Sequence, residues 1–247
     1  MPIPPDPADL YPDIAAHGSL LAALHAVSEG CLSTTSMRSS ESEPLTHVAV
    51  DCHLPYRNPL LISAWVHERR WSVRGTDSFQ DLELVGGRTE DLKEVAAAAL
   101  AWRDGEPLDA LQQAAPFAHL SGRFEAPDLD PARLTASEWQ HLRTEASELN
   151  YPWGPAYQAL VEAVHAEPTL RRLYPFTSHW ALRFSTTTRP NLAVVGPMLS
   201  ARSLDDYTVS KTFTGHDGAQ FSTPRDAVSA AVRELPNGLA SVTLGNT

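Results

Sequence analysis

Apolar positions repeat at two different spacings along this chain, and the change of spacing marks where strands give way to helices. Short runs of β-branched and large apolar residues predict strands at 47–51 and 60–66. Apolar residues at helical spacing predict a helix over 20–27, which Gly30 is placed to terminate. The polar run at 33–44 predicts a loop.

An arrangement of strand, turn, strand and capped helix occurs twice. The first copy starts at Trp71, and we expect Gly86–Gly87 to form the turn before a helix capped by Thr89. The second copy starts at Tyr207, and its helix is capped by Thr223. Because each helix must bury an apolar stripe on a sheet, the repetition predicts an α+β fold of two related antiparallel sheet-plus-helix units.

A helical segment joins the two copies. Residues 104–131 are rich in Pro, Gly and Asp, which is typical of a linker. The capping-box pattern Thr135–Glu138 predicts a helix over about 136–149, and a second helix begins at Pro155. The expected organisation is a disordered tail at 1–12, an N-terminal α+β unit at 13–127, and a helical joint with a C-terminal α+β unit at 128–247.

The charge balance argues against nucleic acid as a partner. Lys and Arg number 19 against 30 for Asp and Glu, so the formal charge is -11. We interpret the densest basic pairs, Arg69–Arg70 and Arg171–Arg172, as solvated ends of elements. Two cysteines exclude a disulfide framework. No apolar run approaches the roughly 18 residues that a membrane-spanning helix needs. We therefore expect a cytoplasmic protein without a membrane partner.

Three stretches of the chain carry a family resemblance. Ala166–Ser185, Ala115–Glu125, and Tyr207–Val209 with Asp226–Pro236 resemble an uncharacterised actinobacterial family whose members are labelled natural-product-biosynthesis proteins. The similarity covers most of residues 85–238. It implies a biosynthetic context, and it implies no reaction, cofactor or catalytic residue.

Neither a metal nor a cofactor is expected from the motifs. Asp51–His53 is the densest group of possible ligands, but alternate strand residues point to opposite faces. Gly86–Thr89 lacks the pattern of a phosphate-binding loop. Gly215–Gly218 brackets a His and an Asp with glycines, which predicts a hairpin turn rather than a catalytic pair.

His179 and Arg183 form the best local candidate for catalysis. An imidazole at His179, beside Ser178, serves as a general acid or base, and the Arg183 guanidinium holds a carboxylate bidentately. His179 precedes a strand expected to begin at Trp180. The alternative is therefore that His179 caps or packs at the start of that strand.

Aromatic residues give the best candidate for binding. Tyr151, Trp153 and Tyr157 join the two central helices. Rings at such a joint either close a small core or line a groove, because Trp and Tyr supply contact area together with a polar group. Tyr174 and Arg189 complete the predicted substrate-binding set.

Three classes of function follow. The first is an accessory or tailoring protein of a natural-product pathway that binds a peptide or small-molecule intermediate, or a pathway enzyme, in a crevice between the units. The alternative is a cofactor-independent enzyme that uses a His acid or base and an Arg clamp. The third is a pure interaction module with a flat exposed apolar patch. Pocket depth separates them.

Overall fold

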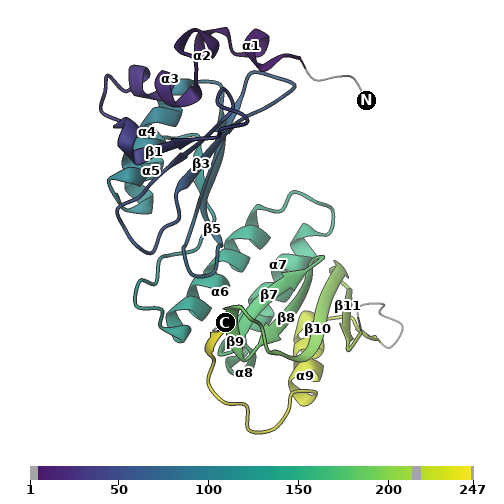
Figure 1. Ribbon diagram of the computed structural model, residues 1–247. Helices are drawn as coiled ribbons and strands as arrows, with labels where there is room; N and C mark the ends of the chain where they lie inside the picture. The colour runs from purple at the N-terminus through teal and green to yellow at the C-terminus, as the bar shows by residue number, and fades with distance from the viewer. Residues whose placement is uncertain (1–4, 213–217, 246–247) are drawn as a thin grey trace. The chain divides into compact units, whose positions relative to one another are not determined.

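The computed structural model describes residues 5–212 and 218–245, and the chain divides into two compact units at Ser121–Gly122 (Figure 1). The sequence places this division a few residues later, near Pro127. Each unit has its own sheet and its own hydrophobic core. The predicted turn at Gly215–Gly218 lies, apart from Gly218, outside the described residues.

The first unit contains a six-stranded antiparallel sheet in the order β1-β2-β3-β4-β5-β6. Its elements are α1 (Pro7–Leu10), α2 (Pro12–His17), α3 (Leu20–Val27), a short 3-10 turn (Thr34–Ser36), β1 (Met37–Ser39), β2 (His47–Val50), β3 (Leu60–Ala64), β4 (Trp71–Thr76), β5 (Glu83–Thr89), α4 (Leu92–Arg103), α5 (Leu108–Ala114) and β6 (Ala118–Leu120). Strand β1 lies in the run that the sequence predicts as a loop, because the single apolar residue Met37 is enough to anchor a short edge strand.

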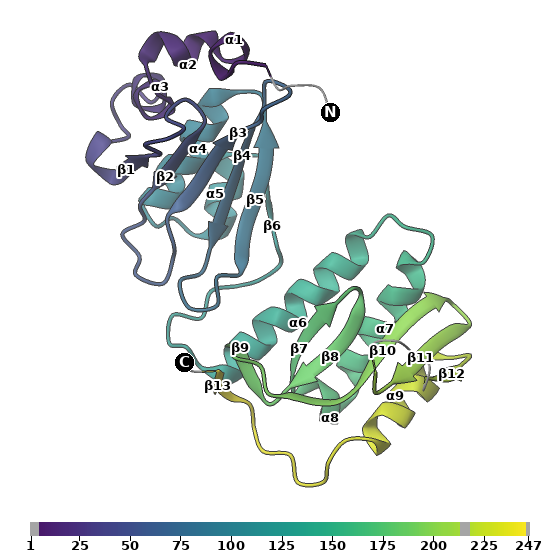
Figure 2. The same cartoon turned by 45° about the vertical axis from the view of Figure 1, so that its right-hand side comes forward.

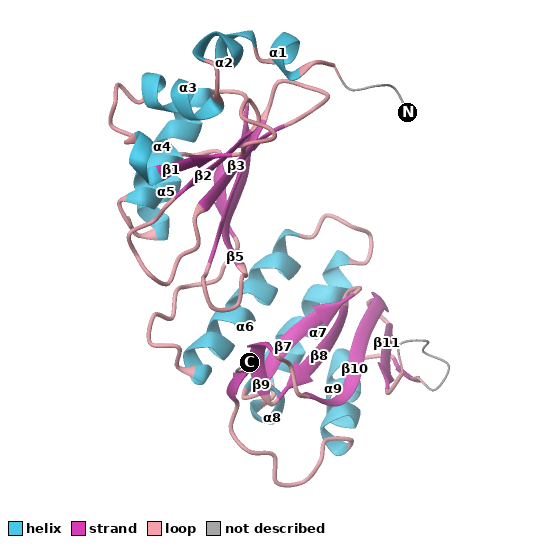
Figure 3. Cartoon of the chain, in the orientation of Figure 1, coloured by secondary structure: helices cyan, strands magenta, loops and turns pink. Residues whose placement is uncertain are grey.

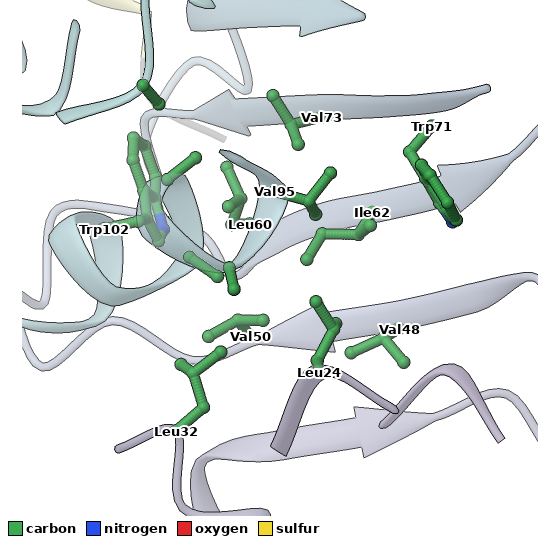
Figure 4. Packing of buried hydrophobic residues seen from close by; sticks show 14 of the residues in the cluster. Leu24, Leu32, Val48, Val50, Leu60, Ile62, Trp71, Val73, Val95 and Trp102 are labelled. Atoms are coloured by element: carbon green, nitrogen blue, oxygen red, sulfur yellow. The ribbon is translucent and has the colours of Figure 1, made fainter. Parts of the chain in front are cut away.

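The core of the first unit lies between the sheet and the helices α3 and α4 (Figure 4). Leu60 and Ile62 point from alternate positions of β3 to the same face. Val95 and Trp102 of α4 and Leu24 of α3 pack against that face, and all five side chains are buried. The apolar side chains at alternate strand positions and those at helical spacing therefore pack against each other in one layer, as the repeated pattern predicts.

The second unit contains a five-stranded antiparallel sheet in the order β12-β11-β10-β8-β7 and a small parallel pair of β13 and β9 (Figure 2). Its elements are α6 (Pro131–Glu148), α7 (Gly154–Ala166), α8 (Pro168–Arg171), β7 (Tyr174–Ser178), β8 (Ala181–Ser185), β9 (Thr187–Pro190), β10 (Val194–Ser203), β11 (Asp206–Ser210), β12 (Ala219–Phe221), α9 (Pro224–Arg233) and β13 (Thr243–Gly245).

Helices α6, α7 and α9 cover one face of this sheet. Leu182 and Phe184 on β8 and Leu199 on β10 supply the sheet side of the core. Tyr157 and Val161 of α7 supply part of the helix side. All five side chains are fully buried, so the helices and the sheet form one packed layer.

The α+β prediction is confirmed (Figure 3). In both units a helix precedes an antiparallel meander, and a further helix follows it: α3 and α4 flank β1 to β5, and α7 and α9 flank the sheet of β7, β8, β10, β11 and β12. The predicted Thr223 cap is confirmed, because its hydroxyl accepts a hydrogen bond from the Asp226 amide (3.1 Å).

The predicted disordered tail is wrong from residue 7 onward. Pro7 and Pro12 stand at the first positions of α1 and α2, where proline fits a helix because its missing N–H is not needed. Tyr11 between them is fully buried. Its hydroxyl lies 2.8 Å from the Trp65 carbonyl oxygen and accepts from the Arg70 amide (3.1 Å). This contact between distant parts of the chain orders the segment.

Two predicted helix starts are shifted. Asp91, rather than Thr89, caps α4, and the Gly86–Gly87 pair lies inside β5 instead of forming a turn. Helix α6 starts at Pro131, so Thr135 lies inside the helix. Its hydroxyl donates to the Pro131 carbonyl (2.7 Å). Each true cap is an Asp a few residues from the predicted one, and the local sequence alone does not rank the two.

Candidate ligand-binding groove

The second unit contains a cavity of about 690 Å³ along its helix α6. This volume lies within the range of small-molecule sites. Helices α6, α7 and α8 and the segment after α9 supply its walls. We call it the α6 groove, and its lining consists of Phe124, Ala132, Thr135, Ala136, Trp139, Gln140, Arg143, His165, Arg171, Arg172, Leu239, Ser241 and Val242.

One face of α6 forms the length of the groove. Ala132, Ala136, Trp139 and Arg143 follow one another at spacings of three and four residues, which places them in one row on a helix. The two alanines leave space above the helix backbone. The apolar part of the row ends at the Arg143 guanidinium, so the groove has an apolar stretch and a basic end.

Trp139 is the floor of the α6 groove. Its side chain is only 2% exposed, and its Nε1 donates to the Arg171 carbonyl oxygen (2.8 Å). The His165 ring meets the indole edge to face, with the ring centroids 5.4 Å apart. The His165 contact and the hydrogen bond fix the indole, which forms the closed, rigid base of the groove.

The groove is basic in an acidic protein. No Asp or Glu is among its lining residues, while the described chain carries many more acids than bases elsewhere. Arg143 forms a bidentate ion pair with Glu162 (2.7 and 3.0 Å), which balances its charge. For Arg171 and Arg172, no carboxylate of the described residues lies within ion-pair distance. These two guanidinium groups therefore carry the net charge of the groove.

His165 contributes an imidazole to the wall of the groove. Burial, and then the positive charges of Arg143 and Arg171, hold the pKa of His165 below its ordinary value, and Glu162 opposes them. The ring is therefore neutral at pH 7 and presents one donor and one acceptor nitrogen.

The segment after α9 closes one side of the groove. Leu239, Ser241 and Val242 line it, and the chain then pairs with β9 as β13. A side chain at Gly245 would place its Cβ 1.9 Å from the Thr188 carbonyl oxygen. Only glycine therefore fits where this segment joins the sheet.

The segment that enters α6 closes the opposite side. Phe124 donates its amide to the Ser137 hydroxyl (3.0 Å), which donates in turn to the Phe124 carbonyl (2.8 Å). Next to it, Arg123 and Glu138 form a bidentate ion pair (2.7 and 3.0 Å) whose side chains are 10% and 5% exposed. The buried pair fixes this segment on α6, and with it the Phe124 wall.

Three of the predicted binding residues come together at the other end of the α6–α7 pair, where the two helices are joined. Tyr151 and Trp153 stack with their ring centroids 5.4 Å apart and their planes 4° from parallel. Tyr157 meets Trp153 edge to face (5.9 Å), and Trp180 contacts both Trp153 (5.2 Å) and Tyr157 (5.7 Å). Tyr151 is 56% and Trp180 39% exposed. We call these four residues the aromatic cluster.

The predicted strand start at Trp180 is wrong. His179 and Trp180 form the two-residue turn between β7 and β8, with φ values of 52° and 65°. Positive φ at both positions is the pattern of a type I′ hairpin turn, which normally selects Asn and Gly. Their absence here hid the turn from sequence analysis. The backbone of Trp180 adopts a left-handed conformation that bulky residues rarely occupy.

His179 is exposed and lines a hollow of about 240 Å³ together with Arg202, Ser210 and Gln220, and Arg183 is not part of that lining. The Arg183 guanidinium lies over the Phe176 ring, 5.6 Å from its centroid. The acid–base role of His179 and Arg183 stays a prediction.

The remaining predicted binding residues lie apart from the aromatic cluster. Tyr174 is fully buried on β7. Arg189 is half-buried on β9. Neither lines the α6 groove. The prediction of a crevice between the two units stays a prediction.

The described residues give no sign of a metal centre. Within residues 5–212 and 218–245, no three His, Cys, Asp or Glu side chains gather around one point. Asp51 instead pairs with Arg38 (2.7 Å), and Cys31 and Cys52 are free thiols. In the same part of the chain no helix has the length and apolar character needed to cross a bilayer.

Sequence analysis missed the α6 groove because its parts are far apart in the chain. The basic pair Arg171–Arg172 was visible, and it was interpreted as an ordinary solvated end. Nothing local connects it to Trp139 or to the segment 239–242. One signal was available: the row of Ala132, Ala136 and Trp139 on one face of a helix leaves room beside an aromatic ring.

Comparison with known protein families gives a match to the C-terminal part of the chain. Residues 133–246 match the model of a family of unknown function, DUF6193. The match includes the stretches Ala166–Ser185 and Asp226–Pro236, and it contains the α6 groove except for Phe124 and Ala132. No curated protein and no solved structure matches the chain.

Proposed function

We propose that this protein is an accessory or tailoring protein of a natural-product pathway, and that it binds a small-molecule or peptide intermediate in the α6 groove. The single observation that carries the binding proposal is the groove itself, with a rigid indole floor, apolar walls and a basic end. The pathway context is supported by the resemblance of Ala166–Ser185 to proteins labelled with natural-product biosynthesis.

The volume and the lining side chains of the groove favour binding of a small organic molecule over binding of another protein's surface. Its volume of about 690 Å³ accommodates a small molecule. Phe124, Leu239 and Val242 offer apolar contact around the Trp139 ring, and Gln140 and Ser241 add hydrogen-bonding groups. Apolar and polar side chains share the lining, and in a ligand site the apolar surface gives affinity while the polar groups fix orientation.

Filling the groove tests the proposal. Ala136 is exposed and lies in the groove row, so an Ala136→Trp substitution fills the space without disturbing the core. Intermediates of the pathway encoded around its gene are titrated calorimetrically into the wild-type protein and this variant. We expect binding to the wild type and a loss of at least about tenfold in affinity in the variant.

A matched substitution separates binding from folding. Ser229→Trp places the same side chain at an exposed position of α9 that does not line the groove. We expect it to leave affinity unchanged, with both variants keeping the wild-type helical circular dichroism. Failure of every intermediate to bind the wild-type protein, or equal affinity in Ala136→Trp, would contradict the proposal.

The aromatic cluster supports a second candidate function, the docking of a partner enzyme. Exposed, mutually fixed Trp and Tyr rings are typical of energetic centres in protein interfaces. Trp180 occupies a backbone conformation that costs stability in a bulky residue, which favours a role outside folding. This second candidate function corresponds to the sequence-based expectation that a pathway enzyme is the partner.

Trp180→Gly distinguishes docking from folding. Glycine relaxes the φ of 65° but also removes a ring that packs on Trp153 and Tyr157, so we expect at most a small fall in melting temperature and at least about a tenfold loss of affinity for the partner enzyme. Leu204→Gly is the control, since Leu204 is 64% exposed outside the cluster. Affinities are measured by biolayer interferometry against the enzymes of the same pathway. Equal loss in both variants would argue against this candidate.

A further inference from the structure

The charge of the α6 groove defines its ligand more closely than its volume does. Arg171 ends α8 and Arg172 follows it as the C-terminal cap, and both residues contribute to the lining. Arg143 lies in the same lining but is occupied by Glu162. Two cations without a described carboxylate partner, beside a groove free of acids, attract an anion.

The neighbouring surface restricts what that anion is attached to. Phe124, Leu239 and Val242 line the same groove as the two arginines. Beneath them the buried Trp139 indole donates to the Arg171 carbonyl oxygen, and His165 contacts its ring. A ligand that satisfies both features has a flat apolar body against these apolar side chains and an anionic group at Arg171 and Arg172.

We propose that the α6 groove binds a small carboxylate with a flat apolar body, whose carboxylate is held by Arg171 and Arg172 and whose body lies against Phe124, Leu239 and Val242. Arginine suits this role because its planar fork donates two parallel hydrogen bonds to a carboxylate. The inference rests on the proposed binding function and specifies its ligand class. It also explains why an acidic chain keeps this groove free of acidic residues.

A pair of probes that differ only in charge tests the inference. Naphthalene-2-acetate and naphthalene-2-acetamide have nearly the same shape, and only the first is an anion. Calorimetric titration of both into the full chain should show the acid binding about tenfold more tightly than the amide. Because a partly exposed charge contact is screened by salt, this preference should shrink as the salt concentration rises.

The double substitution Arg171→Gln with Arg172→Gln identifies the carboxylate partner. It leaves the backbone carbonyl that fixes Trp139 in place, so the floor of the groove persists. We expect the variant to bind the acid and the amide equally, at the wild-type affinity for the amide. Arg225→Gln, an exposed position on α9 outside the groove, is the control and should keep the full preference.

A titration with a peptide tests whether the bound carboxylate belongs to a peptide end or to a small molecule. The peptide Ala-Ala-Phe is titrated as free acid and as amide. A preference for the peptide acid assigns the carboxylate to a peptide end, and a preference confined to the naphthyl pair assigns it to a small molecule; both support the inference.

The possible failures are distinguishable. Equal binding of the naphthyl acid and amide, blocked in both cases by Ala136→Trp, overturns the carboxylate inference and leaves the groove a binding site. A preference for the acid that survives the double arginine substitution also overturns it, since other residues then hold the anion. Absence of binding by both probes at millimolar concentration overturns it as well, while the pathway intermediates still decide the proposed function.

Discussion

Replacing Arg123 with methionine is expected to destabilise the second unit by about 3–5 kcal/mol, because it leaves the Glu138 carboxylate buried without its partner. Glu138 is 4% exposed, and its two oxygens accept from Arg123 at 2.7 and 3.0 Å. Urea unfolding followed by hydrogen exchange measures the loss in unfolding free energy. We expect faster amide exchange in peptides of α6 and α7, the helices around Glu138.

Two further variants isolate the buried ion pair. Arg133→Met removes an arginine of α6, the helix that carries Glu138, and its ion pair with Asp128 is half exposed, so we expect a much smaller loss of stability than in Arg123→Met. Adding Glu138→Leu to Arg123→Met removes the orphaned charge and should recover most of the loss. A cost below about 1 kcal/mol for Arg123→Met would show that water reaches the carboxylate.

Replacing Trp102 with alanine is expected to cost the first unit about 3–5 kcal/mol. The side chain is fully buried between α4 and the sheet, and its Nε1 donates to the Asn58 carbonyl (3.0 Å). The Arg57 guanidinium lies 4.7 Å from the ring centroid. Removal therefore opens a cavity, leaves a carbonyl without its donor and takes away the surface on which a buried guanidinium rests. Hydrogen exchange in β3, β4 and α4 reports the loss.

Gly75 provides the matched test of this packing. A Cβ added there would lie 2.5 Å from the Trp102 ring, so Gly75→Ala alone should cost about 1–3 kcal/mol. In the Trp102→Ala background the same change should cost clearly less, since the ring is gone and only the Val85 side chain, 2.9 Å from the added Cβ, has to shift. Trp65→Ala, a half-buried indole of the same unit, should cost much less than Trp102→Ala. Additive effects of Gly75→Ala and Trp102→Ala would contradict the assigned contact.

Most elements could be predicted because their patterns are local. The strand 60–64 and the helix 20–27 follow from apolar spacing, and the Thr223 cap follows from a side chain that reaches its own helix start. The errors arose where a distant contact decides. Tyr11 orders a proline-rich segment through the backbone of residues 65–70, and no local signal records that contact.

The candidate sites likewise combine residues that are neighbours in the sequence with residues brought together only by distant contacts. Tyr151, Trp153 and Tyr157 lie close in sequence, so their association was within reach of sequence analysis. Trp180 joins them only because an unmarked hairpin turn returns it to the helical joint. Whether rings line a groove or close a core depends on what covers them, and spacing along the chain carries no information about coverage.

By itself the sequence determined the α+β class, the twofold succession of sheet and helix, the acidic surface and the aromatic joint, because each depends on residues that are neighbours in the chain. The α6 groove was decided only by the tertiary structure. Its indole comes from α6, its Arg171 and Arg172 guanidinium groups come from the end of α8 and the residue after it, and its closing segment is residues 239–242. Helix packing and the return of the chain after α9 bring these groups together. The spacing of apolar residues along the chain does not predict contacts between such distant segments.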